Sequence, residues 1–302
     1  MLLTRPIWGR RSDRRAGGPI VNRWAILALP VIVFLAVGFL VPLIVIASRS
    51  VTEFPRNADP SVLSNYQRFF AGEANIRVLG NTFWIAGLST LVCLVVGYPY
   101  AYLMTIVRPR IAGLLLVAVL IPFWSSLLVR TFAWEVILRD TGIINGTLRS
   151  WGLIKTPLPL LRETYSVLIG MSQVLLPFMV LPLYTVMRRI DPEYGKAAAN
   201  LGAPPITAFR RVFLPLSFPG VVAGSLLVFV LALGFYITPA ILGSPKNTML
   251  SEFIVLTATT GSLDWGLASA MAVVLLVLAL AVLLIASRFV RLRDVFGSLD
   301  RE

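Results

Sequence analysis

Histidine is absent from this chain of 302 residues, and cysteine occurs once, as Cys93 inside an apolar run. Zinc, haem and iron–sulfur centres take most of their ligands from these two residue types, so almost nothing remains to hold such a group. One cysteine also excludes a disulfide framework. We therefore expect no metal site in this chain.

Signatures of catalysis are missing as well. A phosphate-binding Walker loop reads Gly-x-x-x-x-Gly-Lys-Ser/Thr, whereas Gly195-Lys196 lacks the upstream glycine and is followed by alanine. The sequence has no nucleophile elbow, no zinc-binding helix and no pair of catalytic carboxylates. We expect no enzymatic activity and no cofactor in this chain. If ATP drives its function, another chain binds ATP with Mg²⁺ and hydrolyses the nucleotide.

Charge is also scarce, at 14% of the residues against 57% hydrophobic residues, whereas about a quarter of a soluble domain is charged. Charged residues are absent from six runs: Trp24–Ser48, Val78–Val107, Ile111–Val129, Thr164–Met187, Val212–Pro245 and Trp265–Ser287. A helix of about 20 apolar residues crosses a bilayer, and lipid excludes open strands because their backbone groups stay unpaired. The sequence predicts an all-α polytopic membrane protein with six transmembrane helices.

The charge that is present is mostly positive, with a net value of +13. With both termini in the cytoplasm, seventeen of the 27 Lys and Arg residues lie on the cytoplasmic side and nine on the opposite side. This bias is the one that orients membrane proteins. We expect contact with membrane lipid and no nucleic-acid partner.

Outside the six runs, several segments have expected structures. Residues 1–22 hold five arginines and are predicted to form a disordered cytoplasmic arm before the six-span domain over 23–302. We expect the third span to cover Ile111–Leu138 and the fifth Pro219–Leu242. Phe253–Leu263 is too short to cross the bilayer, so we expect an outer or re-entrant helix, and the stretch from Thr141 is turn-rich.

The segment at about 188–218, between the fourth and fifth runs, has the features of a structured loop. Ala197 to Ala199 favour a short helix, and Gly202 permits a sharp turn at positive φ without a Cβ penalty. Pro204 and Pro205 set φ for a new helical start. We expect Phe209 with Arg210 and Arg211 to close a second short helix.

This loop resembles the EAA loop of ATP-binding-cassette importer permeases. The similarity rests on the small, apolar and basic positions of the family pattern, at the family spacing: Ala197, Ala198, Leu201, Gly202, Ala203, Phe209, Arg210, Arg211, Leu214, Pro215 and Pro219-Gly220. The resemblance implies the type I importer permease fold and a helix–turn–helix that docks in a groove of the ATPase. Two positions depart from the family: Lys196 replaces a glutamate, and Pro204 replaces a serine that often caps the second helix.

Other stretches resemble permeases of spermidine/putrescine-type importers: Pro122–Trp134, Thr141–Asn145, Leu176–Tyr184 and Gly234–Gly243. The chain carries one EAA-like loop, so it is expected to form half of the membrane portion of an importer. The resemblance implies a bacterial inner membrane protein that works with a second, paralogous permease, two ATPase subunits and a periplasmic substrate-binding protein. The implied mechanism is alternating access, with Pro177, Pro182 and Pro239 as candidate flex points.

A polyamine carries several ammonium groups, which bind carboxylates and aromatic faces. We predict that the translocation path is lined by residues of these types together with one arginine: Trp124, Arg130, Glu135, Phe235 and Tyr236. Glu135 is the only carboxylate expected within a span, and Arg130 would offset its charge. Because carboxylates are so few, a small anionic or zwitterionic substrate such as an opine, a phosphonate or an amino acid derivative stays open.

Two other classes of protein fit a chain with six spans. A secondary transporter would usually contain buried ionisable relays and internal repeats, and neither is apparent here. A membrane scaffold without transport activity is the second alternative. Copurification of an ATPase separates both from an importer permease.

Overall fold

The computed structural model describes residues 23–53, 61–260 and 263–299; the predicted arm over 1–22 lies outside them. By its internal contacts the chain divides into two units, Met1–Val45 and Ile46–Glu302. The described part of the first unit belongs to α1 (Arg23–Thr52), which contains Pro30 and Pro42 and continues into the second unit. Large apolar side chains of α1 in the first unit, such as Phe34 and Phe39, are exposed.

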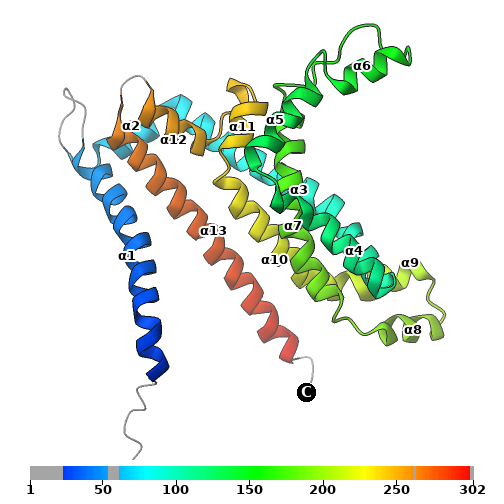
Figure 1. Cartoon of the computed structure of the whole chain (residues 1–302). Helices are drawn as coiled ribbons and strands as arrows, with labels where there is room; N and C mark the ends of the chain where they lie inside the picture. The colour runs from blue at the N-terminus through cyan, green and yellow to red at the C-terminus, as the bar shows by residue number, and fades with distance from the viewer. Residues whose placement is uncertain (1–22, 54–60, 261–262, 300–302) are drawn as a thin grey trace, which may run out of the picture. The chain divides into compact units, whose positions relative to one another are not determined.

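Helices are the regular elements of the second unit in its described residues, and irregular segments such as 151–163 join them (Figure 1). After α1 its elements follow in this order: α2 (Ser64–Ala71), α3 (Glu73–Ile106), α4 (Pro109–Leu120), η1 (Ile121–Trp124), α5 (Leu127–Leu138), α6 (Ile143–Ser150), α7 (Thr164–Met187), α8 (Pro192–Asn200), α9 (Pro205–Ala208), η2 (Phe209–Phe213), α10 (Leu214–Leu233), α11 (Ile237–Leu242), η3 (Pro245–Asn247), α12 (Leu250–Thr259) and α13 (Trp265–Leu299). The predicted all-α class is confirmed.

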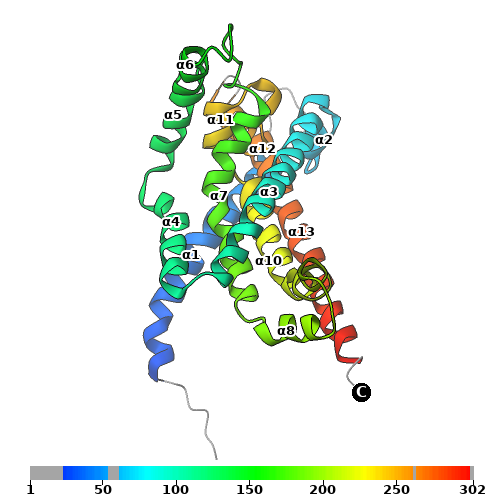
Figure 2. The same ribbon diagram turned by 90° about the vertical axis from the view of Figure 1, so that its right-hand side faces the viewer.

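The core of this unit is formed by α3, α7 and α10, which run side by side (Figures 1 and 2). Met179 and Leu183 of α7 are fully buried. Glycines on α10 let the two helices approach closely, as is common between membrane helices: a Cβ at Gly224 would lie 2.9 Å from the Met179 sulfur and 3.1 Å from its carbonyl oxygen. The α7–α10 pair therefore has no room for larger side chains at this position.

Among the described residues, five helices are long and apolar enough to cross a membrane, and a sixth span is present if one bent pair of helices counts as a span. That pair is the predicted third span, which is not a continuous helix. Pro122 lies in the 3₁₀ turn η1, Ser125 and Ser126 are extended, and the segments on either side meet at 96°. Proline lacks an N–H and clashes with the preceding turn, which accounts for the end of the regular helix here.

The predicted fifth span is also wrong at both ends. Its helix begins upstream of Pro219, which lies inside α10, and it ends at Leu233 rather than Leu242. Residues from Ile237 form the separate helix α11. The stretch predicted as turn-rich contains α6, which follows Gly142, and the expected short helix after the fifth span exists as α12.

Candidate functional site

The first helix of the predicted coupling loop, α8, begins with a strong N-terminal cap. The Asp191 carboxylate accepts a hydrogen bond from the Glu193 backbone N–H at 2.9 Å, and Pro192 occupies the first helical position. Both features stabilise a helix start. Lys196 lies in this helix with its ammonium 2.6 Å from the Glu193 carboxylate, and both side chains are exposed. The Glu193 carboxylate therefore lies one turn before Lys196, the position at which the family carries a glutamate.

The turn after α8 is a Schellman motif centred on Gly202. The Gly202 N–H donates to the Ala199 carbonyl at 2.9 Å, and the Ala203 N–H donates to the Ala198 carbonyl at 3.0 Å. These two bonds satisfy the last carbonyls of the helix and require a left-handed residue between them. Gly202 has φ +81°, which confirms the predicted positive φ.

The second helix of the loop does not close at Arg210 and Arg211, contrary to the prediction. Pro204 caps α9 without a side-chain hydrogen bond, as expected for proline in place of serine. From Pro205 the chain stays helical through the π-helical segment η2 into α10, as one helix of 29 residues ending at Leu233. The loop is thus joined to a membrane span without a break.

Aromatic rings hold this junction against α3. Phe209 and Phe213 stack at 5.7 Å between ring centroids, and the Tyr102 ring packs edge-on against them at 5.3 Å and 5.0 Å. Edge-to-face geometry is the favoured arrangement of such pairs. One turn away, the Tyr98 hydroxyl forms a 2.8 Å hydrogen bond with the hydroxyl of Ser217 on α10. Ring contacts and a hydrogen bond thus join η2 and the start of α10 to α3.

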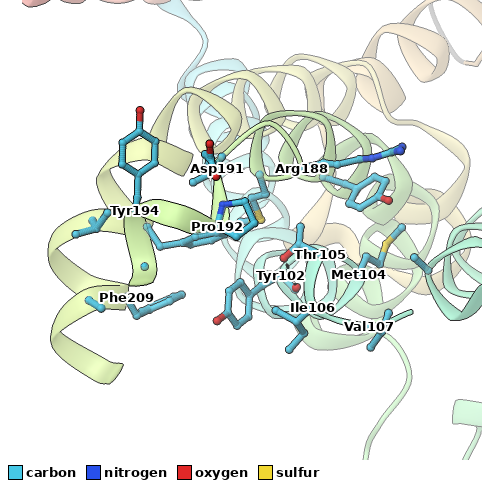
Figure 3. Close-up of a pocket in the computed structure, with 18 of the residues that line it drawn as sticks. Tyr102, Met104, Thr105, Ile106, Val107, Arg188, Asp191, Pro192, Tyr194 and Phe209 are labelled. Carbon is cyan, nitrogen blue, oxygen red and sulfur yellow. Dashed lines mark hydrogen bonds between the residues drawn. The ribbon is translucent and has the colours of Figure 1, made fainter. Parts of the chain in front are cut away.

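The predicted coupling residues lie together at one end of the second unit: Lys196, Ala197 and Ala198 on α8, Leu201, Gly202 and Ala203 in the turn, Phe209, Arg210 and Arg211 on η2, and Leu214 and Pro215 at the start of α10. Large apolar side chains are exposed here, with Leu201 89% and Ile206 65% accessible. A cavity of about 850 Å³ separates this loop from the α3–α4 turn (Figure 3). The loop thus presents an apolar, basic surface above an unfilled space.

The predicted path residues come from three places in the chain. Trp124 lies on η1 and is 76% exposed, Arg130 and Glu135 lie on α5, and Phe235 and Tyr236 lie between α10 and α11. Glu135 pairs with Arg139 at 2.7 Å, one turn further along α5, rather than with Arg130. Arg130 instead donates to the Ser125 carbonyl at 3.2 Å, within the break of the third span. The expected offset of Glu135 by Arg130 is therefore wrong.

A further carboxylate, Glu252, escaped the sequence analysis because it stands one residue before the apolar stretch that begins at Phe253. It lies in the first turn of α12, and its Oε2 atom is buried without a hydrogen-bond partner. Burial raises the pKa of Glu252 above its ordinary value, and a backbone hydrogen bond from Met249 offsets part of that rise. The signal available in the sequence was an acid at the edge of an apolar helix too short to span.

No cluster of metal-ligating side chains occurs in the parts of the chain that the structure describes. Apolar helices long enough to span a membrane, one span broken near Pro122, and an exposed helical loop continuous with α10 define the class of this protein as a polytopic helical membrane protein. Its fold is similar to that of a chain in the crystal structure of a bacterial alginate ABC transporter in complex with an alginate pentasaccharide-bound periplasmic protein. The TM-score is 0.70 at 20% identity, covering 90% of this chain and 96% of that one.

The chain belongs to the family of the binding-protein-dependent transport system inner membrane component, whose model matches residues 21–294. It is 35% identical over 266 residues to the spermidine/putrescine transport system permease protein PotB of Haemophilus influenzae, covering 86% of this chain and 87% of that protein. It is 33% identical over 230 residues to PotB of Escherichia coli, covering 76% and 83%. The resemblance to importer permeases and the type I fold are thereby confirmed.

Proposed function

We propose that this chain is one of two permease subunits of an ATP-driven importer, and that α8 and α9 dock on a separate ATPase subunit. The single observation that carries this proposal is the exposed helical pair that turns at Gly202 and continues into α10 without interruption. A loop that served only to connect two spans would need neither the Schellman turn nor the exposed Leu201 at its tip. Both features suit a short rigid element that inserts into a groove of a partner.

The mechanism follows from this rigid connection. Closure of two ATPase subunits on ATP and Mg²⁺ draws the two docking loops together, and α10 moves with its loop because no flexible joint separates them. The Tyr102 contacts transfer part of the movement to α3. The path between the two permeases then opens to the periplasm, where a binding protein delivers substrate, and hydrolysis resets the assembly. In this arrangement the loop and both termini face the cytoplasm.

A second permease is proposed because the chain supplies one docking loop and two are needed for two ATPases. We propose that it is a paralogue, as the resemblance to spermidine/putrescine-type importers implies. Trp124, Arg130, Glu135, Phe235 and Tyr236 are retained as path residues. The break of the third span supports this placement, because discontinuous membrane helices commonly line substrate sites in transporters.

The proposed substrate is a polyamine such as spermidine or putrescine. Support comes from relatives named as spermidine/putrescine permeases, which match most of the chain at 32–35% identity. The aromatic rings of Phe235 and Tyr236 at the α10–α11 break supply faces that attract ammonium groups.

Two measurements test the proposal. The purified chain should copurify its ATPase. Proteoliposomes that hold the full importer should transport labelled spermidine or putrescine only when ATP is present on the side of the membrane where the ATPase subunits lie. Uptake of a phosphonate or an opine in place of a polyamine would support the anionic or zwitterionic alternative. Uptake that follows an ion gradient without ATP would overturn the importer assignment.

A further inference from the structure

The cavity of about 850 Å³ between the loop of α8 and α9 and the α3–α4 turn lies where two membrane spans end. Its lining includes Val107, which precedes Arg108 at the end of the charge-free run of α3 (Figure 3), and Met187, which precedes Arg188 at the end of α7. Apolar spans end at the boundary between hydrocarbon and lipid headgroups. The cavity volume lies within the range of about 300–1,000 Å³ that is typical of ligand sites.

The walls of this cavity are mostly apolar. Met104 of α3 and Leu116 of α4 line it, and the Gly113 backbone between them and the loop leaves space unfilled. The same helix α4 exposes large apolar side chains along its length: Ile111 45%, Leu114 70% and Val117 51%. Such side chains suit the hydrocarbon of a bilayer, so the apolar group at hand to fill the cavity is a lipid tail.

Positive charge surrounds the same space. Arg188 lines the cavity and is followed by Arg189, while Arg108 and Arg110 flank Pro109, which lines it from the α3–α4 turn. All four arginines are exposed, and none of them forms an ion pair within the described part of the chain. The cavity therefore has a basic rim without counter-charges.

The acidic groups at this end of the unit do not neutralise that rim. Asp191, which also lines the cavity, accepts the Glu193 N–H as the cap of α8, and the Glu193 carboxylate pairs with Lys196. The hydroxyls of Tyr184 and Tyr194 line the cavity as well and donate no hydrogen bond to any described residue. Guanidinium and hydroxyl groups of this kind donate to phosphate oxygens.

We propose that this cavity binds an anionic phospholipid, with the headgroup phosphate on Arg188 and an acyl chain against Met104 and Leu116. Basic pockets between transmembrane helices on the cytoplasmic side recognise anionic headgroups in this way. A soluble anion would leave the apolar walls in contact with water, and a lipid without net charge would leave the basic rim uncompensated. The proposal concerns the bilayer around the protein and depends neither on the substrate nor on the ATPase.

Native mass spectrometry of the full chain, purified in detergent, measures the binding of dioleoyl phosphatidylglycerol and of dioleoyl phosphatidylcholine. The anionic lipid should bind more tightly. Arg188→Gln should raise its Kd about tenfold or more, because a charge-assisted hydrogen bond to phosphate becomes a neutral one. Gly113→Leu should weaken binding several-fold, since a Cβ at this lining residue meets no atom within 4 Å and the leucine fills the cavity without a clash.

Two residues of α6 outside the cavity supply matched controls. Arg149 is exposed, and a Cβ at Gly146 also meets no atom within 4 Å. Arg149→Gln and Gly146→Leu should therefore keep the parent Kd for phosphatidylglycerol.

Equal affinity for the two phospholipids, or parent affinity in either Arg188→Gln or Gly113→Leu, would overturn the proposal. Displacement of the lipid by inorganic phosphate would assign the arginine to a soluble anion instead. Displacement by added ATPase would assign the cavity to the subunit interface, which also overturns it. A failure of ATP-driven uptake would contradict the proposed function and leave these binding outcomes unchanged.

Discussion

Replacing Gly202 with valine tests whether the turn between α8 and α9 is a rigid part of the docking loop. Gly202 has φ +81°, and a Cβ built there meets no atom within 4 Å. The substitution therefore introduces backbone strain and no clash. The left-handed region costs a residue with a Cβ about 1–2 kcal/mol, and a β-branched side chain is less tolerated still.

That cost corresponds to a drop of about 5- to 30-fold in the ratio of the native turn to its other conformations. ATP-driven uptake by Gly202→Val should therefore fall, by up to this factor, while insertion and copurification of the second permease stay normal. Asparagine visits the left-handed region more readily, so Gly202→Asn should keep most activity. Uptake is measured in proteoliposomes at matched permease content.

Gly195 supplies the control. It lies inside α8, and a Cβ there also meets open space, but its backbone does not have a positive φ. Gly195→Ala should leave uptake unchanged, because alanine is favoured over glycine in a helix. Parent-level uptake by Gly202→Val, or equal losses for the valine and asparagine variants, would refute the reasoning.

Three further predictions concern packing and charge. Gly224→Val, whose Cβ would lie 2.9 Å from the Met179 sulfur, should lower stability by about 1–3 kcal/mol through overpacking, seen as a lower melting temperature in detergent; an unchanged value would contradict the α7–α10 contact. Tyr98→Phe removes the hydrogen bond to Ser217 and should cost about 1 kcal/mol in the same assay, while full stability would argue against that bond. Because burial raises the pKa of Glu252, the native state favours the protonated acid, and this contribution is lost as the pH rises through the folded pKa. Glu252→Gln should therefore melt higher than the parent above that pKa, and the difference should vanish below the unfolded value of about 4.3; a difference that grows toward low pH would refute it.

The helix–turn–helix geometry of the loop was predictable because its signals are local. Gly202 needs no tertiary contact to favour positive φ, and Pro205 starts a helix from its own ring geometry. The helical class and the number of spans follow from runs without charge. These predictions depend on composition and on neighbours in sequence.

Where a helix breaks and where it continues depends on packing between residues that are far apart in the sequence. Pro177 and Pro182 stay inside α7, whereas Pro122 lies where the third span ends its regular helix, so proline alone does not separate a kink from a break. At the junction of α9 with α10 the Phe209 ring packs against Tyr102 of α3, a contact between residues more than a hundred positions apart in sequence. The pairing of Arg68 with Asp264, 196 residues apart in sequence, is likewise visible only in the folded chain.

The most direct test of the account measures from which side of the membrane Leu201 is accessible and whether the ATPase covers it. A cysteine at this position would be at the tip of the loop, where the native side chain is 89% exposed, while the natural Cys93 is fully buried and gives little background. In intact cells a membrane-impermeant maleimide should not label Leu201→Cys, in inverted vesicles it should, and added ATPase should protect the site. Labelling from the periplasmic side, or labelling that the ATPase does not reduce, would contradict the claim that this loop couples ATP hydrolysis to transport.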